Sequence, residues 1–373
     1  MYHFCFLTGS YGRQDPLMFE RQGKSLVEAG FKVTYIVCDD LPNEKVDGIE
    51  FVSTNFVPKG RFEQFLHTSK HIIRVAKVIN ADVYQISDPE MIASVKALKK
   101  MGKAVVFNMR EDYSELLMRK HYIPKFLRKT AVRVYDAMMR RFLKLYDAVF
   151  SVTDSIVNKL KEQFHLDNCY LLTNFPRVRN DYNFDFDDYL KRGDVLCYTG
   201  YIYKRSRQKK VFEALMDLHS VHYILAGKIE ENNESIIQHP YWKQVEFIDG
   251  FNKEQQYEIL KKSTIANVFR DFGKGNDGSW GVIKIFEAME AALPVLITDV
   301  PLYRGIIEKY QCGICVNPND VNSIKNAIKF LITNKKEAYM MGQRGRKAVI
   351  EEYNWDKQAE KYIQVINQII AIR

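Results

Sequence analysis

Two side chains of opposite charge, Lys284 and Glu287, lie one turn apart at the start of a mostly apolar predicted helix. The preceding residues 273–281 are rich in glycine and lead directly into this helix. Backbone N–H groups and the helix dipole at such a place favour an anion such as a diphosphate. A carboxylate one turn later can accept two hydrogen bonds from a vicinal diol such as a ribose. Together these features predict a nucleotide-binding site, whereas the alternative is an ordinary amphipathic helix with one stray glutamate.

A second group of cations follows Gly200, where a predicted strand leads into a helix. Within this group Arg207 is the favoured phosphate ligand, because a guanidinium offers two parallel N–H donors to phosphate oxygens. A solvated basic loop is the alternative interpretation. Lys284 is more informative than a surface lysine, because a cation at a helix N-terminus is unfavourable unless an anion compensates it.

Charged residues also follow predicted strands in the first half of the chain. Gly12 and Arg13 come after the first strand, where the glycine allows close approach of a ligand or serves a turn. Arg110 and Glu111 follow a later strand and either contact a ligand or form an internal ion pair. Asp88 precedes a proline and is interpreted as a helix cap. No metal site is expected, because the histidines and paired aspartates lack the spacing of metal ligands.

Strand-like and helical patterns alternate along the chain, which predicts parallel α/β architecture. Residues 175–193 interrupt this alternation and are interpreted as an interdomain linker. We therefore predict two doubly wound, Rossmann-like parallel-sheet domains, residues 1–178 and 194–354, that face a ligand cleft at the carboxyl ends of their strands. The predicted strands are His3–Thr8, Val33–Val37, Glu50–Ser53, Val83–Ile86, Ala104–Asn108, Ala148–Val152, Tyr170–Leu172, Val195–Thr199, His222–Leu225, Val245–Ile248, Ile265–Phe269, Val295–Ile297 and Ile314–Val316.

The segment Lys284-Ile-Phe-Glu287-Ala-Met289, followed by Leu293-Pro-Val-Leu-Ile297, resembles part of the family 4 glycosyltransferases, which use nucleotide sugars. Similar correspondences along nearly the whole chain are Asp15-Pro16, Asp88-Pro89-Glu90, Arg110-Glu111, Asn174-Phe-Pro176 and Tyr353-Asn-Trp355. The resemblance implies the two-domain GT-B fold, retention of anomeric configuration, and a role for Glu287 on the donor ribose. It also implies that a helix over residues 355–373 packs back on the N-terminal domain. Ser279 stands where many members carry a second glutamate.

The same resemblance implies that the C-terminal domain binds the donor, with a UDP-sugar expected, and that the N-terminal domain presents the acceptor. The candidate donor-binding residues are Lys204, Arg205, Arg207, Lys209, Ser279, Gly281, Val282, Lys284 and Glu287. The candidate acceptor-binding residues are Gly12, Arg13, Arg110 and Glu111. The candidate catalytic residues are Glu111, Arg207, Lys284 and Glu287.

The formal net charge of +9 lies almost wholly in the first half, where residues 1–180 hold 28 Lys and Arg against 20 Asp and Glu. Residues 119–144 alone hold nine basic residues and one acid, interleaved with apolar side chains. Such a basic amphipathic stretch is compatible with peripheral contact with an anionic membrane, and equally with a solvated face over a packed core. No nucleic-acid-binding motif accompanies the charge, so nucleic acid is not an expected partner.

The chain is expected to be cytoplasmic, either free in the cytoplasm or in peripheral contact with the inner membrane face. It has no run of 18 apolar residues, and its first residues are typical of a strand and not of a signal peptide. Its six cysteines are scattered, as in a protein with reduced thiols.

These patterns lead to one hypothesis and two alternatives. The hypothesis is a retaining, metal-independent glycosyltransferase without a cofactor, which moves a sugar from a nucleotide sugar to a glycan or lipid-linked acceptor in polysaccharide or cell-surface glycan synthesis. A sugar-nucleotide epimerase of similar fold and a non-catalytic nucleotide-sugar-binding protein are the alternatives.

Overall fold

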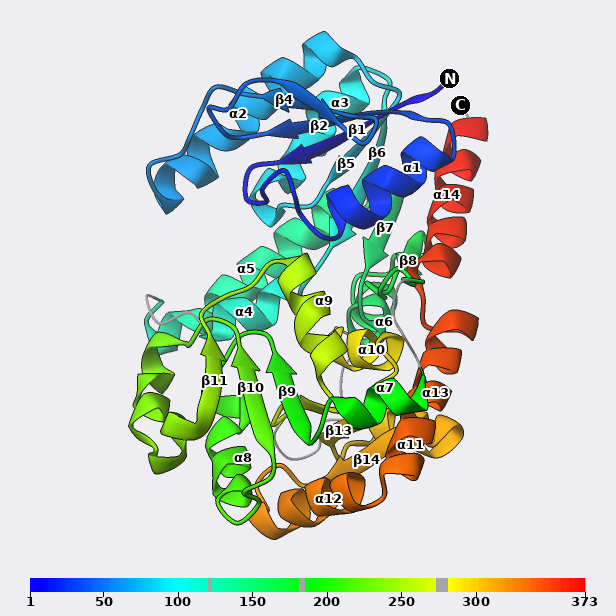
Figure 1. Cartoon of the computed structure of the whole chain (residues 1–373). Helices are drawn as coiled ribbons and strands as arrows, with labels where there is room; N and C mark the ends of the chain where they lie inside the picture. Colours follow the sequence, from blue (N-terminus) through cyan, green and yellow to red (C-terminus); the bar gives the residue numbers. More distant parts are fainter. Residues whose placement is uncertain (120–122, 181–184, 273–280, 373) are drawn as a thin grey trace. The chain divides into compact units, whose positions relative to one another are not determined.

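The computed structural model describes residues 1–119, 123–180, 185–272 and 281–372 (Figure 1). The chain divides into two compact units. Unit 1 comprises residues 1–174 and 355–373, and unit 2 comprises residues 175–354. Each unit is a parallel sheet with helices on both faces (Figure 1). Unit 2 is therefore inserted within the sequence of unit 1.

Among the described residues, unit 1 contains an eight-stranded sheet in the order β3-β4-β2-β1-β5-β6-β7-β8. All neighbours pair in parallel except β3, which runs antiparallel to β4 at the edge. Parallel sheets covered on both faces are built from continuous apolar strands, and five of the six residues of β1 are buried. The strands are β1 (His3–Thr8), β2 (Lys32–Val37), β3 (Glu44–Val46), β4 (Ile49–Ser53), β5 (Val83–Ile86), β6 (Ala104–Met109), β7 (Ala148–Ser151) and β8 (Cys169–Leu171).

The helices of unit 1 lie in two layers. One layer packs on the core that includes Cys5 and Leu7, and the other packs on the core that includes Phe4 and Phe6, so alternate residues of β1 serve opposite faces. The first layer contains α2 (Arg61–Ile79), the 3₁₀-helix η2 (Pro89–Ser94), α3 (Val95–Lys100), α5 (Lys125–Leu143) and α6 (Asp154–Glu162). The second contains the π-helix η1 (Met18–Gly23), α1 (Lys24–Glu28) and α14 (Trp355–Ala371), and α4 (Tyr113–Arg119) packs on α5.

The C-terminal helix α14 is attached to unit 1 by buried polar contacts as well as by apolar packing. The indole Nε1 of Trp355 donates to Ser25 Oγ at 2.9 Å. Tyr362 Oη donates to Gln85 Oε1 at 2.8 Å, and Gln85 Nε2 donates to Gln22 Oε1 at 2.8 Å. Since an unmade hydrogen bond is costly in a core, these contacts favour one docking position for the helix.

Unit 2 contains, among the described residues, a six-stranded parallel sheet in the order β11-β10-β9-β12-β13-β14. Its strands are β9 (Val195–Thr199), β10 (His222–Ala226), β11 (Val245–Ile248), β12 (Ile265–Val268), β13 (Val295–Thr298) and β14 (Gly313–Val316). Its helices are α7 (Phe186–Lys191), η3 (Lys204–Ser206), α8 (Gln208–Leu215), η4 (Glu231–Gln238), η5 (Pro240–Gln244), α9 (Lys253–Lys262), α10 (Lys284–Glu290), α11 (Pro301–Tyr310), α12 (Val321–Thr333) and α13 (Lys335–Glu351). No helix in the described ranges is both long and apolar enough to cross a membrane.

Residues 175–193 were predicted to be an interdomain linker, but the described residues of this segment belong to unit 2. The ring of Phe175 packs against those of Phe286 and Tyr353, with centroid distances of 4.6 and 5.5 Å. The backbone N–H of Arg179 donates to Glu290 Oε1 at 2.7 Å. The segment is rich in polar residues, yet its few apolar and charged side chains fix it to the core.

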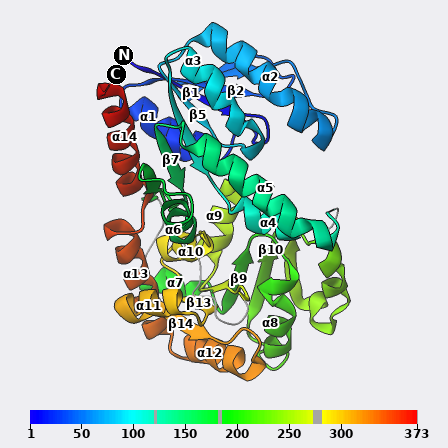
Figure 2. The same ribbon diagram turned by 180° about the vertical axis from the view of Figure 1, so that it is seen from behind.

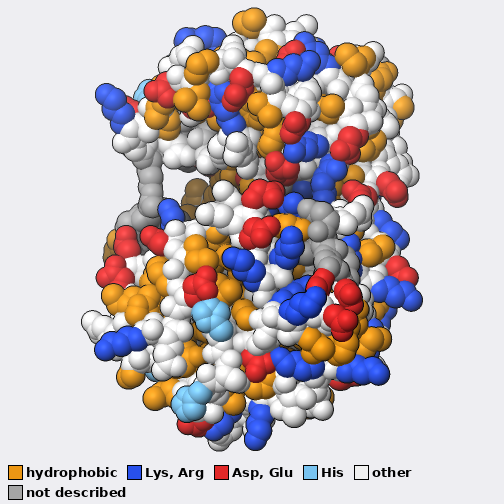
Figure 3. All heavy atoms as spheres, in the orientation of Figure 1, with side chains coloured by type: hydrophobic (Ala, Val, Ile, Leu, Met, Phe, Trp, Pro, Cys, Tyr) orange, Lys and Arg blue, Asp and Glu red, His pale blue; other side chains and the backbone are white. Residues whose placement is uncertain are grey.

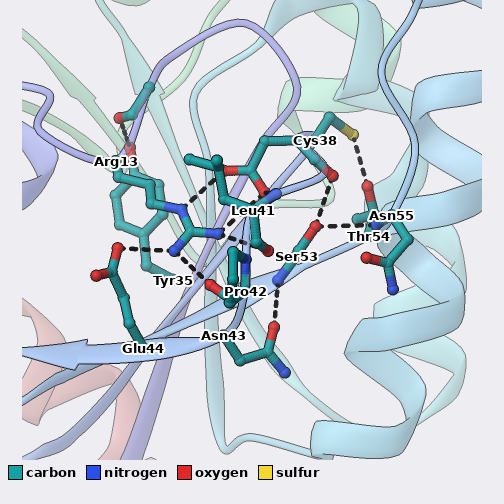
Figure 4. Close-up of polar contacts among 12 residues, drawn as sticks. Arg13, Tyr35, Cys38, Leu41, Pro42, Asn43, Glu44, Ser53, Thr54 and Asn55 are labelled. Carbon is teal, nitrogen blue, oxygen red and sulfur yellow. Dashed lines mark hydrogen bonds and ion pairs between the residues drawn. The ribbon is translucent and has the colours of Figure 1, made fainter.

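The loop after β1 is fixed by Arg13, whose side chain is only 9% exposed. Its Nε and Nη2 donate to the two carboxylate oxygens of Asp39 at 2.7 and 3.1 Å, and its Nη1 donates to Glu44 Oε1 at 2.7 Å. The carbonyls of Leu41 and Pro42 accept further bonds at 3.1 and 2.8 Å (Figure 4). Burial by itself would raise the pKa of Asp39, but the hydrogen bonds and charge of Arg13, with further bonds from Ser53 and the Leu41 backbone, together hold that pKa below its usual range. Arg13 therefore ties the β1 loop to the connection between β2 and β3.

We expect Arg13→Met to destabilise unit 1 by about 3 kcal/mol, because it leaves Asp39 and two carbonyls without their donor. Lys32→Met is the matched control, because the Lys32–Glu50 ion pair is exposed and should contribute less than about 1 kcal/mol. The measurement is the urea midpoint for amide-hydrogen exchange in peptides covering β1, β2 and β4. Equal shifts in the two variants would contradict the structural role of Arg13.

Candidate functional site

Two glycines shape the carboxyl edge of the sheet in unit 2. Gly200 follows β9 and Gly227 follows β10, with φ of +139° and +140°, a region that side-chain-bearing residues rarely adopt. A Cβ on Gly227 would lie 1.9 Å from the carbonyl oxygen of Gly200. A Cβ on Gly200 would lie 2.1 Å from Nζ of Lys284. The glycines therefore let the two loops meet and let the lysine side chain pass over the first of them.

Lys284 is the first residue of α10, and its ammonium lies against the end of β9. Nζ donates to Tyr198 Oη at 2.7 Å and lies 4.2 Å from the centroid of the Tyr198 ring. Burial is the main reason why the pKa of Lys284 is lowered to about 8; the charge of Glu287 opposes this shift and the charge of Arg270 adds to it. Ring and hydroxyl stabilise the cation, but neither supplies the negative charge that a buried ammonium needs. The surroundings of Lys284 are therefore suited to an anionic ligand.

Glu287 follows one turn later, and its side chain is 14% exposed. Gln256 Nε2 donates to Glu287 Oε2 at 2.8 Å, and Lys253 forms an ion pair with Oε1. Both partners come from α9, which begins with a capping box between Asn252 and Gln255. These contacts orient the group, and each carboxylate oxygen can accept more than one hydrogen bond, as a diol ligand requires.

In the basic segment 204–209, two side chains have partners within unit 2 and two are exposed. Arg207, in a left-handed backbone conformation with φ of 54°, forms an ion pair with Asp271. Lys209 Nζ donates to Ser235 Oγ at 2.9 Å. Lys204 and Arg205 are exposed. The prediction that Arg207 is the favoured phosphate ligand therefore differs from its observed position, where a carboxylate already balances its charge.

The remaining predicted donor-binding residues lie just before α10. Val282 is buried in the core of unit 2, so its side chain is not available to a ligand. Gly281 is exposed, and Ser279 lies outside the described residues.

Arg270, which the sequence analysis missed, follows β12 at the same edge of the sheet. Its backbone N–H donates to Thr298 Oγ1 at 3.0 Å, and its guanidinium lies over the ring of Phe272 at 5.2 Å. A lone arginine directly after a predicted buried strand was the available signal. Tyr198, Lys253 and Gln256 were also missed, because nothing local in the sequence connects them with Lys284 and Glu287.

The two arginines among the predicted acceptor residues of unit 1 have internal partners. Arg110 Nη1 donates to Asp15 Oδ2 at 2.8 Å, and its guanidinium lies 4.1 Å from the centroid of the Tyr11 ring. Arg13 is fully engaged, as described above. No Cβ clash or positive φ requires a glycine at position 12. Glu111 is exposed and makes no polar contact with the part of the chain that the structure describes.

Asp88 occupies the N-cap position of η2, but its side chain does not cap that helix. The carboxylate is fully buried and accepts the backbone N–H of Gly9 at 2.9 Å. Burial, and next the nearby Glu90, raise the pKa of Asp88 to about 6. Glu90 Oε1 accepts from Ser10 Oγ at 2.8 Å and from Gln64 Nε2 at 3.3 Å. Asp88 and Glu90 thus hold the ends of β1 and β5 together.

No cluster of His, Cys, Asp or Glu within the described ranges has the arrangement of a metal site. The described side chains at the carboxyl edge of unit 2 instead combine two cations, Lys284 and Arg270, with one oriented carboxylate, Glu287. This combination is suited to a ligand that carries both an anion and hydroxyl groups.

Comparison with known proteins gives the family. The profile described as Glycosyltransferase Family 4 matches residues 19–174, and the profile described as Glycosyl transferases group 1 matches residues 183–348. An uncharacterized glycosyltransferase, MJ1607 of Methanocaldococcus jannaschii, is 26% identical over 119 residues, which span 32% of this chain and 28% of that protein.

Solved structures agree at the level of the fold. The sucrose-phosphate synthase of Thermosynechococcus elongatus superposes with a TM-score of 0.74 over the whole of both chains at 15% identity. Anabaena HepE in complex with UDP-glucose gives a TM-score of 0.67 at 12% identity, over 99% of this chain and 100% of its own. WaaG, a glycosyltransferase of lipopolysaccharide biosynthesis, gives 0.68 at 15% identity, over 98% of this chain and 99% of its own. The two family profiles together show that the chain belongs to the family 4-like glycosyltransferases, and the solved structures show that it has the GT-B fold.

Proposed function

We propose that this glycosyltransferase moves a hexose from a nucleoside diphosphate sugar, with a UDP-sugar as the donor, to a glycan or lipid-linked acceptor. The observation that carries the proposal is the buried ammonium of Lys284, which lies at the carboxyl edge of unit 2 with Glu287 one turn away. HepE, a relative in fold, was solved with UDP and with UDP-glucose, which supports the choice of donor.

In this proposal unit 2 holds the donor. Lys284 stabilises the diphosphate, and Glu287 accepts hydrogen bonds from the 2′- and 3′-hydroxyls of the ribose. The bond between the anomeric carbon and the diphosphate oxygen breaks, and negative charge develops on the leaving phosphate. A fixed cation stabilises that charge most where water is excluded, and the low exposure of the site supports this role. We further propose that the reaction retains anomeric configuration and needs neither a metal ion nor a cofactor.

Unit 1 takes the acceptor in the same proposal. Glu111 is exposed at the end of β6, so its carboxylate is available to an acceptor hydroxyl. Arg13 and Arg110 act indirectly, because their charges fix the loops that follow β1 and β6. The setting would be polysaccharide or cell-surface glycan synthesis in the cytoplasm.

The direct test is transfer of radiolabelled sugar from UDP-glucose, UDP-galactose and UDP-N-acetylglucosamine to a membrane glycolipid extract, with and without EDTA. Transfer in EDTA and a product with the anomeric configuration of the donor would support the proposal. Interconversion of the donor sugar without an acceptor would indicate an epimerase, and nucleotide binding without turnover would indicate a binding protein.

Replacing Glu287 with Ala should weaken UDP binding by about 1–3 kcal/mol, because the ribose hydroxyls lose a charged acceptor in a poorly solvated site. Calorimetry with UDP and with 2′,3′-dideoxy-UDP isolates this contact, since the variant and the wild type should bind the dideoxy analogue alike. Glu258→Ala, an exposed position on α9, is the control. An equal loss for both ligands would show that Glu287 acts only through the fold.

The affinity for UDP should fall as the pH rises through about 8. The pKa of Lys284 lies near 8 in the free protein, so above that pH the site must take up a proton before it presents a cation to the diphosphate. The dissociation constant should then rise by up to about tenfold per pH unit. Calorimetry between pH 7 and pH 9 measures this slope. Lys284→Met should bind UDP weakly with no such slope, and Lys243→Met, at an exposed site, should behave as the wild type.

We also propose that α5 contacts an anionic membrane. Its C-terminal half packs on unit 1 through Met139 and Leu143, while Phe126 is 81% exposed and Val134 is 66% exposed. Lys125, Lys129 and Arg133 are exposed on the same helix, which is labelled in Figure 2. In the view of Figure 3, basic and acidic side chains are interspersed. Apolar side chains amid exposed cations are typical of a helix that lies on lipid.

Reversing the charge at positions 125, 129 and 133 with Glu should weaken binding to vesicles that contain phosphatidylglycerol by roughly 100-fold, at about 1 kcal/mol per basic residue. Co-sedimentation measures this change. The control reverses three exposed lysines of unit 2, Lys243, Lys262 and Lys329. The membrane proposal fails if the two triple variants lose binding equally or if the wild type does not sediment.

A further inference from the structure

Arg270 is a cation without a balancing carboxylate. It is partly buried at the end of β12, and its guanidinium makes no ion pair or hydrogen bond with any residue that the structure describes. Its guanidinium lies over the ring of Phe272, 5.2 Å from the centroid. Arginines withdrawn from solvent normally have an acidic partner, because the desolvated charge is otherwise unfavourable.

The same edge of the sheet brings Arg270 towards Lys284. Strands β9 and β12 are hydrogen-bonded neighbours, and Gly200 and Arg270 follow their carboxyl ends. Lys284 lies directly over Gly200. The backbone N–H of Asp271 donates to the carbonyl of Arg205 at 2.8 Å, which draws the loop after β12 to the loop after β9. Arg270 is close enough to lower the pKa of both Lys284 and Tyr203.

The other cations of this edge differ from this pair. Arg207 has its carboxylate in Asp271, and Lys209 is turned to a hydroxyl on η4. Lys204 and Arg205 are exposed, so water screens them and an anion gains little there. Lys284 and Arg270 instead repel one another in a poorly solvated place, and a ligand with two or more negative charges would relieve that repulsion.

We infer that Arg270 and Lys284 together form the diphosphate-binding pair of unit 2, and that Arg207 is a structural residue of the neighbouring loop. This inference rests on the proposed function and adds Arg270 as a phosphate-binding residue. The guanidinium supplies two parallel donors to oxygens of one phosphate, and the ammonium supplies a compact charge for the other. Glu287, one turn beyond Lys284, then lies on the ribose side of the same nucleotide.

The test uses the whole chain and calorimetry with three probes. The first is the tightest binder among UDP, GDP and ADP, the second is the matching nucleoside, and the third is inorganic pyrophosphate. Arg270→Gln should weaken binding of the nucleoside diphosphate and of pyrophosphate at least tenfold and leave the nucleoside unchanged. Arg270→Lys should restore part of the loss. Arg304→Gln is the matched control, an arginine after the adjacent strand β13 that is paired with Asp299.

A second readout separates ligand binding from a role in the fold. Without ligand, Arg270→Gln should melt at or above the wild-type temperature, because it removes the repulsion on Lys284. The thermal shift on adding the nucleoside diphosphate should be smaller than in the wild type. Arg270→Gln should also move the pH dependence of nucleotide binding to higher pH, because the pKa of Lys284 rises when the neighbouring cation is lost.

The outcomes distinguish the inference from the function on which it rests. If the wild type binds none of the three nucleoside diphosphates, both are overturned. If it binds one of them and Arg270→Gln binds it equally well, or loses the nucleoside to the same extent, the inference alone is overturned. A loss confined to Arg207→Gln would assign the diphosphate to the residue that the sequence favoured and would likewise overturn the inference.

Discussion

The arrangement of unit 2 depends on one electrostatic constraint, a lysine ammonium held against backbone at the carboxyl edge of a parallel sheet. Lys284 can lie there only because Gly200 has no side chain, and it is tolerated there because Tyr198 provides a ring and a hydroxyl. Burial lowers its pKa to about 8, so the charge is retained at neutral pH at a cost to the unliganded fold. A site that holds a charge in such an unfavourable place favours binding of an anion, because the anion supplies the missing countercharge.

Arg13 and Arg110 of unit 1 differ from Lys284 and Arg270 of unit 2 in how their charges are balanced. In unit 1, Arg13 and Arg110 have carboxylate partners at 2.7 and 2.8 Å. These ion pairs balance the charges of the two arginines and hold the loops in place. In unit 2, Lys284 and Arg270 lack such partners among the described residues, and their fields remain available to a ligand. This contrast supports the proposed binding of the anionic nucleotide by unit 2.

Much of the fold could be predicted from the sequence, because parallel strands buried on both faces are continuous apolar runs. Val83–Ile86 and Val195–Thr199 have the predicted bounds, whereas β3 was missed because its three residues are exposed and follow no apolar pattern.

The site could be predicted only where it is local in sequence. Lys284 and Glu287 share one helical turn, so their spacing is visible, and their surroundings in the structure are compatible with the role that we propose. Partner choice is different, because Arg110 meets Asp15 across 95 residues and Arg13 meets Asp39 across 26. Whether a cation is committed to a carboxylate or available to a ligand depends on tertiary contacts of this kind, which is why Arg207 was favoured and Arg270 was overlooked.

The path of the chain adds a constraint on how the units can be separated. Unit 1 is completed by α14, which places Trp355 and Tyr362 in its core, so residues 1–174 alone lack part of the helical layer on one face of their sheet. Unit 2 is continuous from residue 175 to residue 354 and contains both of its apolar cores. The proposed nucleotide-binding residues therefore belong to the part of the chain that has its whole core within one continuous segment. Unit 1 depends on residues made after unit 2, so its folding during synthesis cannot be completed until the last helix emerges.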